Sequence, residues 1–176
     1  MTRQARALDV LLTEVDKHAP NRSKTSDGGL GDQAHAARKS DHNPNAAGVW
    51  RARDFTHDPK HLPGGELAKL LKELLGKHPA MNSGAYIIWN RRIVSYDRLA
   101  EGWRPYTGAD PHTGHVHLSV STAAAGYDST RAWNLFTPKP TRVSKACDYL
   151  EAALPHRSPA DQAKIRTALG ILRPIA

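Results

Sequence analysis

Three histidines fall within six positions of the segment HTGHVHLSV, residues 112–120. Val116 and Leu118 alternate with polar residues, which predicts a strand with one apolar face. Because side chains alternate between the two faces of a strand, His115 and His117 are expected to share the other face. Neutral imidazole is a common metal ligand. The segment therefore predicts a metal-binding platform on the polar face of a strand.

Two further donors stand upstream, His42 in KSDHNPN and Asp54 in VWRARDF. A catalytic zinc commonly takes three His or Asp/Glu ligands at about 2.0–2.2 Å and keeps one position for water. His42, Asp54 and His117 can supply that set. The single cysteine, Cys147, excludes an all-thiolate zinc site, and no HExxH helix is present. The alternative interpretation is a solvated His-rich loop, or one imidazole hydrogen-bonded in the core.

The order of these residues resembles the LAS metallopeptidases. Their motif is Ser-x-His-x-x-Gly-x-Ala-x-Asp, followed downstream by His-x-His or Glu-x-x-His. Ser40, His42, Ala52 and Asp54 match the first part, and residues 115–117 match the second. The group includes D-Ala-D-Ala carboxypeptidases, the L-Ala-D-Glu endopeptidases of phage lysins and lysostaphin-type enzymes. The resemblance covers roughly residues 30 to 121 and implies Zn²⁺ as the cofactor, with His42, Asp54 and His117 as its ligands.

The chain departs from this motif between the first two ligands. Eleven residues separate His42 from Asp54, where the family motif has six. NPNAAGVW, residues 43–50, would then be an inserted loop. Peptidase domains of actinobacteriophage endolysins look similar, with a Ser-Asp-His-Asn-Pro stretch and a later His-Thr-x-His-x-His. The insertion is therefore interpreted as a subfamily trait.

Hydrolysis at such a site needs a group that takes and returns a proton. Many relatives use the Glu of Glu-x-x-His, but Gly114 stands at that position here. His115 and His112 are the two candidates for the catalytic acid/base. Asp110 and Glu101 are outside possibilities.

Ser40 and Arg38 are candidates for substrate binding. Ser40 lies within the first motif, and Arg38 lies just before it. Arg38, with Lys39 beside it, could hold a substrate carboxylate, and Arg does so in a bidentate way. A solvated basic loop is the equally simple interpretation.

The formal net charge of +8 and the pI near 9.8 favour a polyanionic partner, whether nucleic acid, acidic lipid or an anionic cell wall. With the resemblance, the leading hypothesis is a zinc peptidase that cleaves stem peptides of bacterial peptidoglycan. An L-Ala-D-Glu endopeptidase is favoured over a D-Ala-D-Ala carboxypeptidase, because a lysin must break the mesh. A metal-dependent nuclease is the main alternative, although no Lys/Arg stripe interleaved with aromatic residues is evident. A non-catalytic, zinc-containing wall-binding module is the third.

The N-terminal twenty residues do not resemble a signal peptide, because Asp9, Glu14 and Asp16 interrupt the apolar run. No stretch reaches eighteen apolar residues, so no membrane span is expected. The chain is expected to be made in the cytoplasm. The endolysin resemblance implies that it reaches the cell wall after holin-type release.

The elements that must position these residues indicate an α+β fold, in which helices flank a small antiparallel sheet that carries the zinc site. Amphipathic helices are expected up to about His18 and over 64–76, a strand over 49–55, and a hairpin that turns near Asn90 and Arg91. Residues 1–137 form the expected peptidase domain. Residues 138–176 form a linker and a C-terminal helical pair of unknown role, whose last helix begins near Ser158. The oligomeric state stays open.

Overall fold

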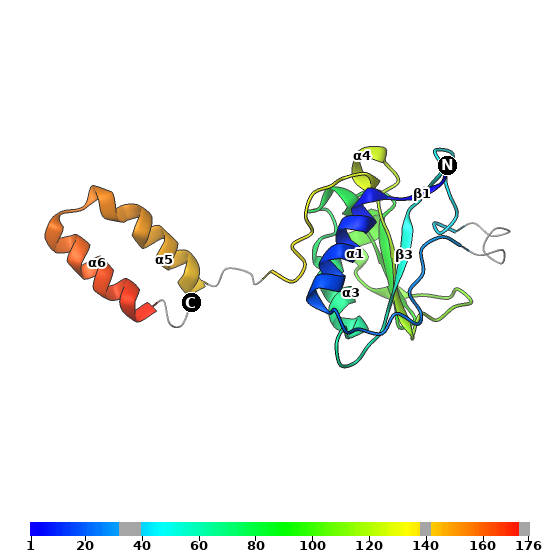
Figure 1. The fold of residues 1–176 in the computed structure, drawn as a ribbon, viewed down its shortest axis with the longest axis horizontal. Coiled ribbons are helices and arrows are strands. Elements are labelled where there is room, and N and C mark those ends of the chain that lie inside the picture. The colour runs from blue at the N-terminus through cyan, green and yellow to red at the C-terminus, as the bar shows by residue number, and fades with distance from the viewer. Residues whose placement is uncertain (32–39, 138–141, 173–176) are drawn as a thin grey trace. The chain divides into compact units, whose positions relative to one another are not determined.

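The computed structural model describes residues 1–31, 40–137 and 142–172. Helices and an antiparallel sheet make up the fold, so the expected α+β class is confirmed (Figure 1). The chain divides into two compact units, Met1–Phe136 and Thr137–Ala176. All candidate site residues that the structure describes belong to the first unit.

A five-stranded sheet with the order β3-β7-β4-β5-β6 forms the centre of the first unit. All its neighbouring strands run antiparallel. The strands are β3 (Ala52–Thr56), β7 (His115–Ser119), β4 (Tyr86–Trp89), β5 (Arg92–Ser95) and β6 (Arg104–Pro105). An antiparallel sheet can bury one face and keep functional side chains on the other.

The buried face of the sheet is covered by two amphipathic helices, α1 (Arg6–His18) and α3 (Gly64–Glu73), which lie on the same side of it (Figure 1). Val116, Leu118 and Phe55 are fully buried there, in one cluster with the apolar residues of both helices. The alternation that predicted an apolar back for residues 115–120 is confirmed. The polar residues of β7 therefore face the other way.

The predicted hairpin turn is also confirmed, with φ of 45° at Asn90 and 63° at Arg91. Positive φ at both central residues is the signature of a type I′ turn, whose twist suits a two-residue hairpin. The backbone N–H groups of Asn90 and Arg91 donate to the carbonyls of His112 and Pro111 at 2.9 and 2.8 Å. The turn thus holds the loop that enters β7.

The strand expected over 49–55 is two strands in the structure. β2 (Val49–Trp50) pairs in parallel with β1 (Arg3–Gln4), whereas β3 joins the main sheet. The backbone N–H groups of Arg51 and Ala52 both donate to the carbonyl of Asp41, at 2.9 and 3.1 Å. These two hydrogen bonds mark the point where the chain passes from one sheet into the other. Residue alternation could not reveal this point.

Short elements complete the first unit: the 3₁₀ segments Pro79–Met81 and Tyr96–Glu101, and α4 (Ala124–Tyr127).

The second unit contains α5 (Arg142–Ala153), a 3₁₀ turn at Leu154–His156 and α6 (Pro159–Leu172). Cys147 and Leu169 are buried within it. Ser158 caps α6, since its Oγ accepts from the Asp161 N–H at 3.3 Å. Over the described part of the chain, every helix is too short or too polar to cross a membrane.

Candidate metal centre

His42, Asp54 and His117 come together on the polar face of the sheet. Asp54 on β3 stands directly opposite His117 on β7, so their side chains share a face. Oδ1 of Asp54 lies 2.9 Å from Nδ1 of His117, and Oδ2 lies 3.3 Å from Nε2 of His42. The two imidazole nitrogens are 3.2 Å apart. The three predicted ligands thus form one group of converging donor atoms.

These separations match what a small tetrahedral ion requires. With ligands at about 2.0–2.1 Å, a tetrahedral ion holds neighbouring donor atoms about 3.3 Å apart. The three distances of 2.9, 3.2 and 3.3 Å are close to that value. His42 and His117 are 6% and 5% exposed, so both rings are fixed by packing. The group could accept an ion with shifts of a few tenths of an ångström.

The second nitrogen of each histidine bonds outside the group. Nδ1 of His42 donates to the carbonyl of Gly29 at 2.6 Å, and a carbonyl can only accept. Nε2 of His117 bonds Oγ of Ser119 at 3.1 Å. Such partners of metal-binding histidines fix the tautomer and the ring orientation. They leave Nε2 of His42 and Nδ1 of His117 to face Asp54.

The charges of the group suit a cation. Burial alone would raise the pKa of Asp54, but hydrogen bonds and attraction from His117 and His42 outweigh it, and the pKa lies well below its ordinary value. Burial lowers the pKa of His42, but the Asp54 carboxylate more than compensates, and the net shift is upward. Asp54 is therefore an ionised carboxylate at neutral pH, beside two imidazoles. Borderline transition metals such as zinc favour this donor set.

The segment before His42 is joined to the Asp54 strand. Gly28 and Asp54 exchange backbone hydrogen bonds, with N–O distances of 3.3 and 2.7 Å. A Cβ on Gly28 would lie 3.1 Å from Oδ2 of Asp54, so a side chain would crowd the carboxylate. Gly28 and Gly29 thus place their backbone atoms close to this side of the donor group.

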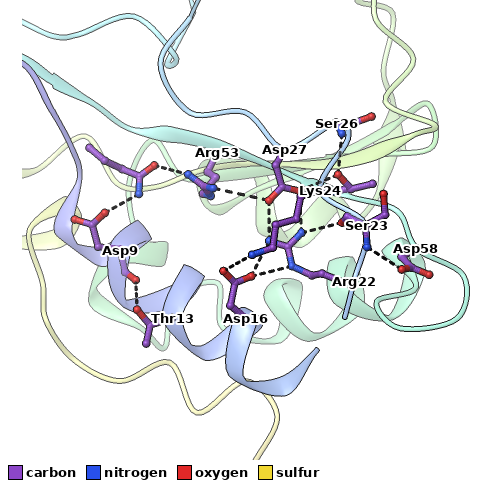
Figure 2. Close-up of polar contacts among 12 residues, drawn as sticks. Asp9, Thr13, Asp16, Arg22, Ser23, Lys24, Ser26, Asp27, Arg53 and Asp58 are labelled. Atoms are coloured by element: carbon purple, nitrogen blue, oxygen red, sulfur yellow. Dashed lines mark hydrogen bonds and ion pairs between the residues drawn. The ribbon is translucent and has the colours of Figure 1, made fainter. Parts of the chain in front are cut away.

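A buried ion-pair network holds the Gly28–Gly29 segment in place (Figure 2). The Arg22 side chain is fully buried and donates to both carboxylate oxygens of Asp27, at 2.8 and 2.7 Å. It also donates to Asp16 of α1 at 3.0 Å. Asp27 Oδ1 accepts from the backbone N–H and the hydroxyl of Thr56 on β3, at 2.9 and 2.8 Å. The network therefore ties the loop that carries Gly28 and Gly29 to both α1 and β3.

A second group of donors lies beside the first: Asp110, His112 and His115. Nε2 of His115 is 3.8 Å from Asp54 Oδ1 and 3.8 Å from Asp110 Oδ2. The His112 ring centroid is 4.9 Å from that of His115 and 5.4 Å from that of His117. Burial, and then the proximity of His117, lower the pKa of His112. Both predicted acid/base candidates thus border the metal group.

The predicted substrate-binding residues have different outcomes. Oγ of Ser40 accepts from the backbone N–H of His42 at 3.2 Å, so Ser40 lies next to a candidate ligand. Arg38 and Lys39 lie outside the described residues. Of the outside candidates for the acid/base, Glu101 forms an exposed ion pair with Arg98. Substrate contact by Ser40 and Arg38 stays a prediction.

Sequence reasoning missed two contributors to the group. The Gly29 carbonyl is a backbone atom, and no residue type signals its use. Tyr86 on β4 stands opposite Ser119 on β7. The Tyr86 ring stacks on the His117 ring, with their centroids 5.3 Å apart. Burial, and then the Asp41 carboxylate, raise the pKa of Tyr86, so the phenol keeps its proton. The alternation of β4 could have placed Tyr86 on this face, had the strand order been known.

No family model, no curated protein sequence and no solved structure matches this chain. The geometry described above is therefore the basis for a functional assignment.

A separate pocket of about 240 Å³ lies where α3 meets the β4–β5 hairpin. Its lining includes Trp89, Trp103, Lys69 and Arg92. His57, just past β3, contributes to this region as a structural residue: its Nδ1 accepts from the Gly64 N–H at 2.9 Å, and its ring contacts Trp89. His57 therefore stabilises the start of α3.

Replacing Ser119 by alanine is expected to weaken metal binding at the candidate metal centre about 10- to 100-fold, because His117 loses the partner that orients its ring. Competition with a chromophoric chelator measures this affinity. Ser121→Ala is the matched control: Ser121 is equally buried and follows the same strand, but its hydroxyl donates to the Ser83 carbonyl. Equal affinities in the two variants would show that the Ser119 contact does not orient the ligand.

Proposed function

We propose that this chain is a zinc-dependent peptidase of the LAS type that hydrolyses stem peptides of bacterial peptidoglycan. The observation that supports it best is the convergence of His42, Asp54 and His117 at separations suited to a tetrahedral ion. Three protein ligands from His and Asp/Glu, with one position left over, are typical of catalytic zinc. The order Ser40, His42, Asp54, His117 is also that of the LAS motif.

Zinc bound there would supply a Lewis acid that polarises a peptide carbonyl and acidifies a water. The chain must then supply the group that takes a proton from the nucleophile and returns it to the leaving amine. His115 has the better position, since its Nε2 is 3.8 Å from the Asp54 carboxylate. Asp110 Oδ2 lies 3.8 Å from the same nitrogen. His112 is the alternative proton carrier.

The substrate class rests on charge and resemblance. A net charge of +8 favours association with the anionic bacterial wall. Ser40, beside His42, and Arg38 are the proposed substrate contacts. Cleavage between L-Ala and D-Glu is favoured because it opens the peptidoglycan mesh. In this proposal the chain is made in the cytoplasm and reaches the wall after holin-type release.

The decisive assay offers two substrates to the zinc-loaded chain, purified peptidoglycan and plasmid DNA. We expect mass spectrometry to detect new free amines on stem peptides, and the masses of the fragments to identify the cleaved bond. The DNA should remain intact. DNA nicking without any change in the muropeptides would replace the peptidase with a nuclease. No product from either substrate would favour a non-catalytic wall-binding module.

Replacing His115 by alanine is expected to lower kcat about 10²- to 10⁴-fold with zinc still bound, because a proton-transfer group is lost. His112→Ala is the matched comparison, and we expect a smaller loss. Elemental analysis of bound zinc separates this effect from metal loss. A larger kcat loss in His112→Ala would assign the proton transfer to His112 instead.

A further inference from the structure

The Asp110, His112 and His115 group has a composition that proton transfer alone does not explain. Each residue offers one donor atom, and the three atoms lie within 4.8 Å of one another. We propose that this group is a second, weaker site for a divalent transition metal, adjacent to the first across Asp54, and that filling it inhibits the enzyme. Metal binding here is independent of the proposed function, whereas the inhibition rests on it.

His112 is held in place by several contacts. Its φ is 50°, a left-handed conformation that a non-glycine residue adopts only when its surroundings enforce it. The backbone N–H donates to Asp110 Oδ1 at 2.8 Å, and the carbonyl accepts from Asn90 N–H at 2.9 Å. Nδ1 donates to the Asp110 carbonyl at 2.7 Å, which leaves Nε2 as the nitrogen able to bind a metal. The hairpin turn and Asp110 thus fix one imidazole ligand before any ion binds.

His115 links the two groups of donors. Its Nε2 lies at the same distance, 3.8 Å, from Asp54 Oδ1 and from Asp110 Oδ2. A tetrahedral ion needs neighbouring donors about 3.3 Å apart, so the His115–Asp110 separation has to shrink by roughly half an ångström. The Asp110 carboxylate is 58% exposed and can make that movement. Two imidazoles and one carboxylate again form a set suited to zinc.

The second site should be the weaker one for two reasons. Its carboxylate is 58% exposed and accepts one backbone hydrogen bond, from His112, whereas Asp54 is mostly buried and held by two histidines. A second cation beside the first also meets electrostatic repulsion, which the shared neighbour Asp54 offsets only in part. Filling therefore follows the order first site, then second.

The inhibition follows from the use of His115. An imidazole nitrogen bound to a metal has no lone pair with which to accept a proton. Activity should therefore rise with the first equivalent of zinc and fall with the second. This dependence requires no change in fold.

Metal stoichiometry tests the second site without any substrate. The metal-free full chain is titrated with Zn²⁺ by calorimetry and with Co²⁺ by visible absorption. We expect two equivalents for the unchanged chain, the second weaker, and one equivalent for Asp110→Asn and for His112→Gln. Glu101→Gln is the matched control, an exposed carboxylate engaged with Arg98, and should keep two equivalents. Circular dichroism verifies that each variant is folded.

One equivalent in the unchanged chain at millimolar zinc would overturn the second site. Two equivalents that persist in both Asp110→Asn and His112→Gln would place the weaker ion elsewhere, for example at the partly buried His61 and Asp58 pair. If peptidoglycan is cleaved, a second equivalent that binds but does not slow cleavage would overturn the inhibitory role alone. If peptidoglycan is not cleaved, the stoichiometry still decides the site, and only the proposed function fails.

Discussion

Replacing His117 by alanine is expected to abolish zinc binding at the first site and, with it, peptidoglycan cleavage. The change removes one of the three proposed ligands. This ligand lies on β7, the strand that also carries His115. Loss of a hydrogen-bond partner of a ligand already costs about 10- to 100-fold in metal affinity, and loss of the ligand itself must cost more. It also deprives the ionised Asp54 of its nearest imidazole, since His42 and His115 lie farther away, at 3.3 and 3.8 Å.

Zinc content after dialysis, measured by elemental analysis, is the first readout. Thermal unfolding with and without zinc is the second, because an ion that binds only the folded chain raises its stability by mass action. The melting temperature of the His117 variant should no longer respond to micromolar zinc. His156→Ala, in the second unit, removes a histidine outside the donor group and should behave like the unchanged chain. Cleavage that survived the His117 change would show that the ligand assignment is wrong.

The part of the site predicted from sequence is the part governed by strand geometry. The alternation of residues 115–120 indicated which side chains face the core, and Val116, Leu118 and Val120 are fully buried. Positive φ at Asn90 and Arg91 agrees with the expected turn. These features depend on short-range periodicity, which a single sequence carries.

The part that sequence could not predict depends on contacts between distant segments. The Gly29 carbonyl orients His42 across 13 residues, and no side chain marks that role. The expected strand over 49–55 breaks because the Asp41 carbonyl accepts two hydrogen bonds at Arg51 and Ala52. The left-handed conformation of His112 depends in part on a hydrogen bond from the hairpin turn. Tertiary contacts of this kind override local patterns.

The second large effect is expected in stability, from replacing Arg22 by methionine. The Arg22 side chain is fully buried, and its loss leaves the carboxylates of Asp27 and Asp16 without their shared guanidinium. Removing one partner of a buried ion pair costs about 3–5 kcal/mol of unfolding free energy. Urea unfolding at pH 7 measures this loss. Lys24→Met is the matched control: Lys24 pairs with Asp16 but is about half exposed, so about 0–1 kcal/mol is expected.

The same network predicts how the stability of the folded chain changes at acid pH. Burial would raise the pKa of Asp27, but hydrogen bonds from Arg22 and Thr56 outweigh it, and the net shift is downward. A carboxyl whose pKa is lower in the folded chain stabilises it above the unfolded pKa, near 4, and loses that contribution as the pH falls through the folded pKa. The unchanged chain should therefore lose stability below about pH 4, and Asp27→Asn should lose less over that range.

Because the network ties the Gly28–Gly29 segment to α1 and β3, Arg22→Met should also weaken zinc binding, through the Gly29 contact to His42. Lys24→Met again supplies the control. If zinc affinity stayed unchanged while stability fell, the network would support the fold without positioning the metal site. If stability also stayed within 1 kcal/mol, the buried ion pair would be compensated elsewhere, and the account of how His42 is held would have to rest on the Gly28–Asp54 backbone bonds alone.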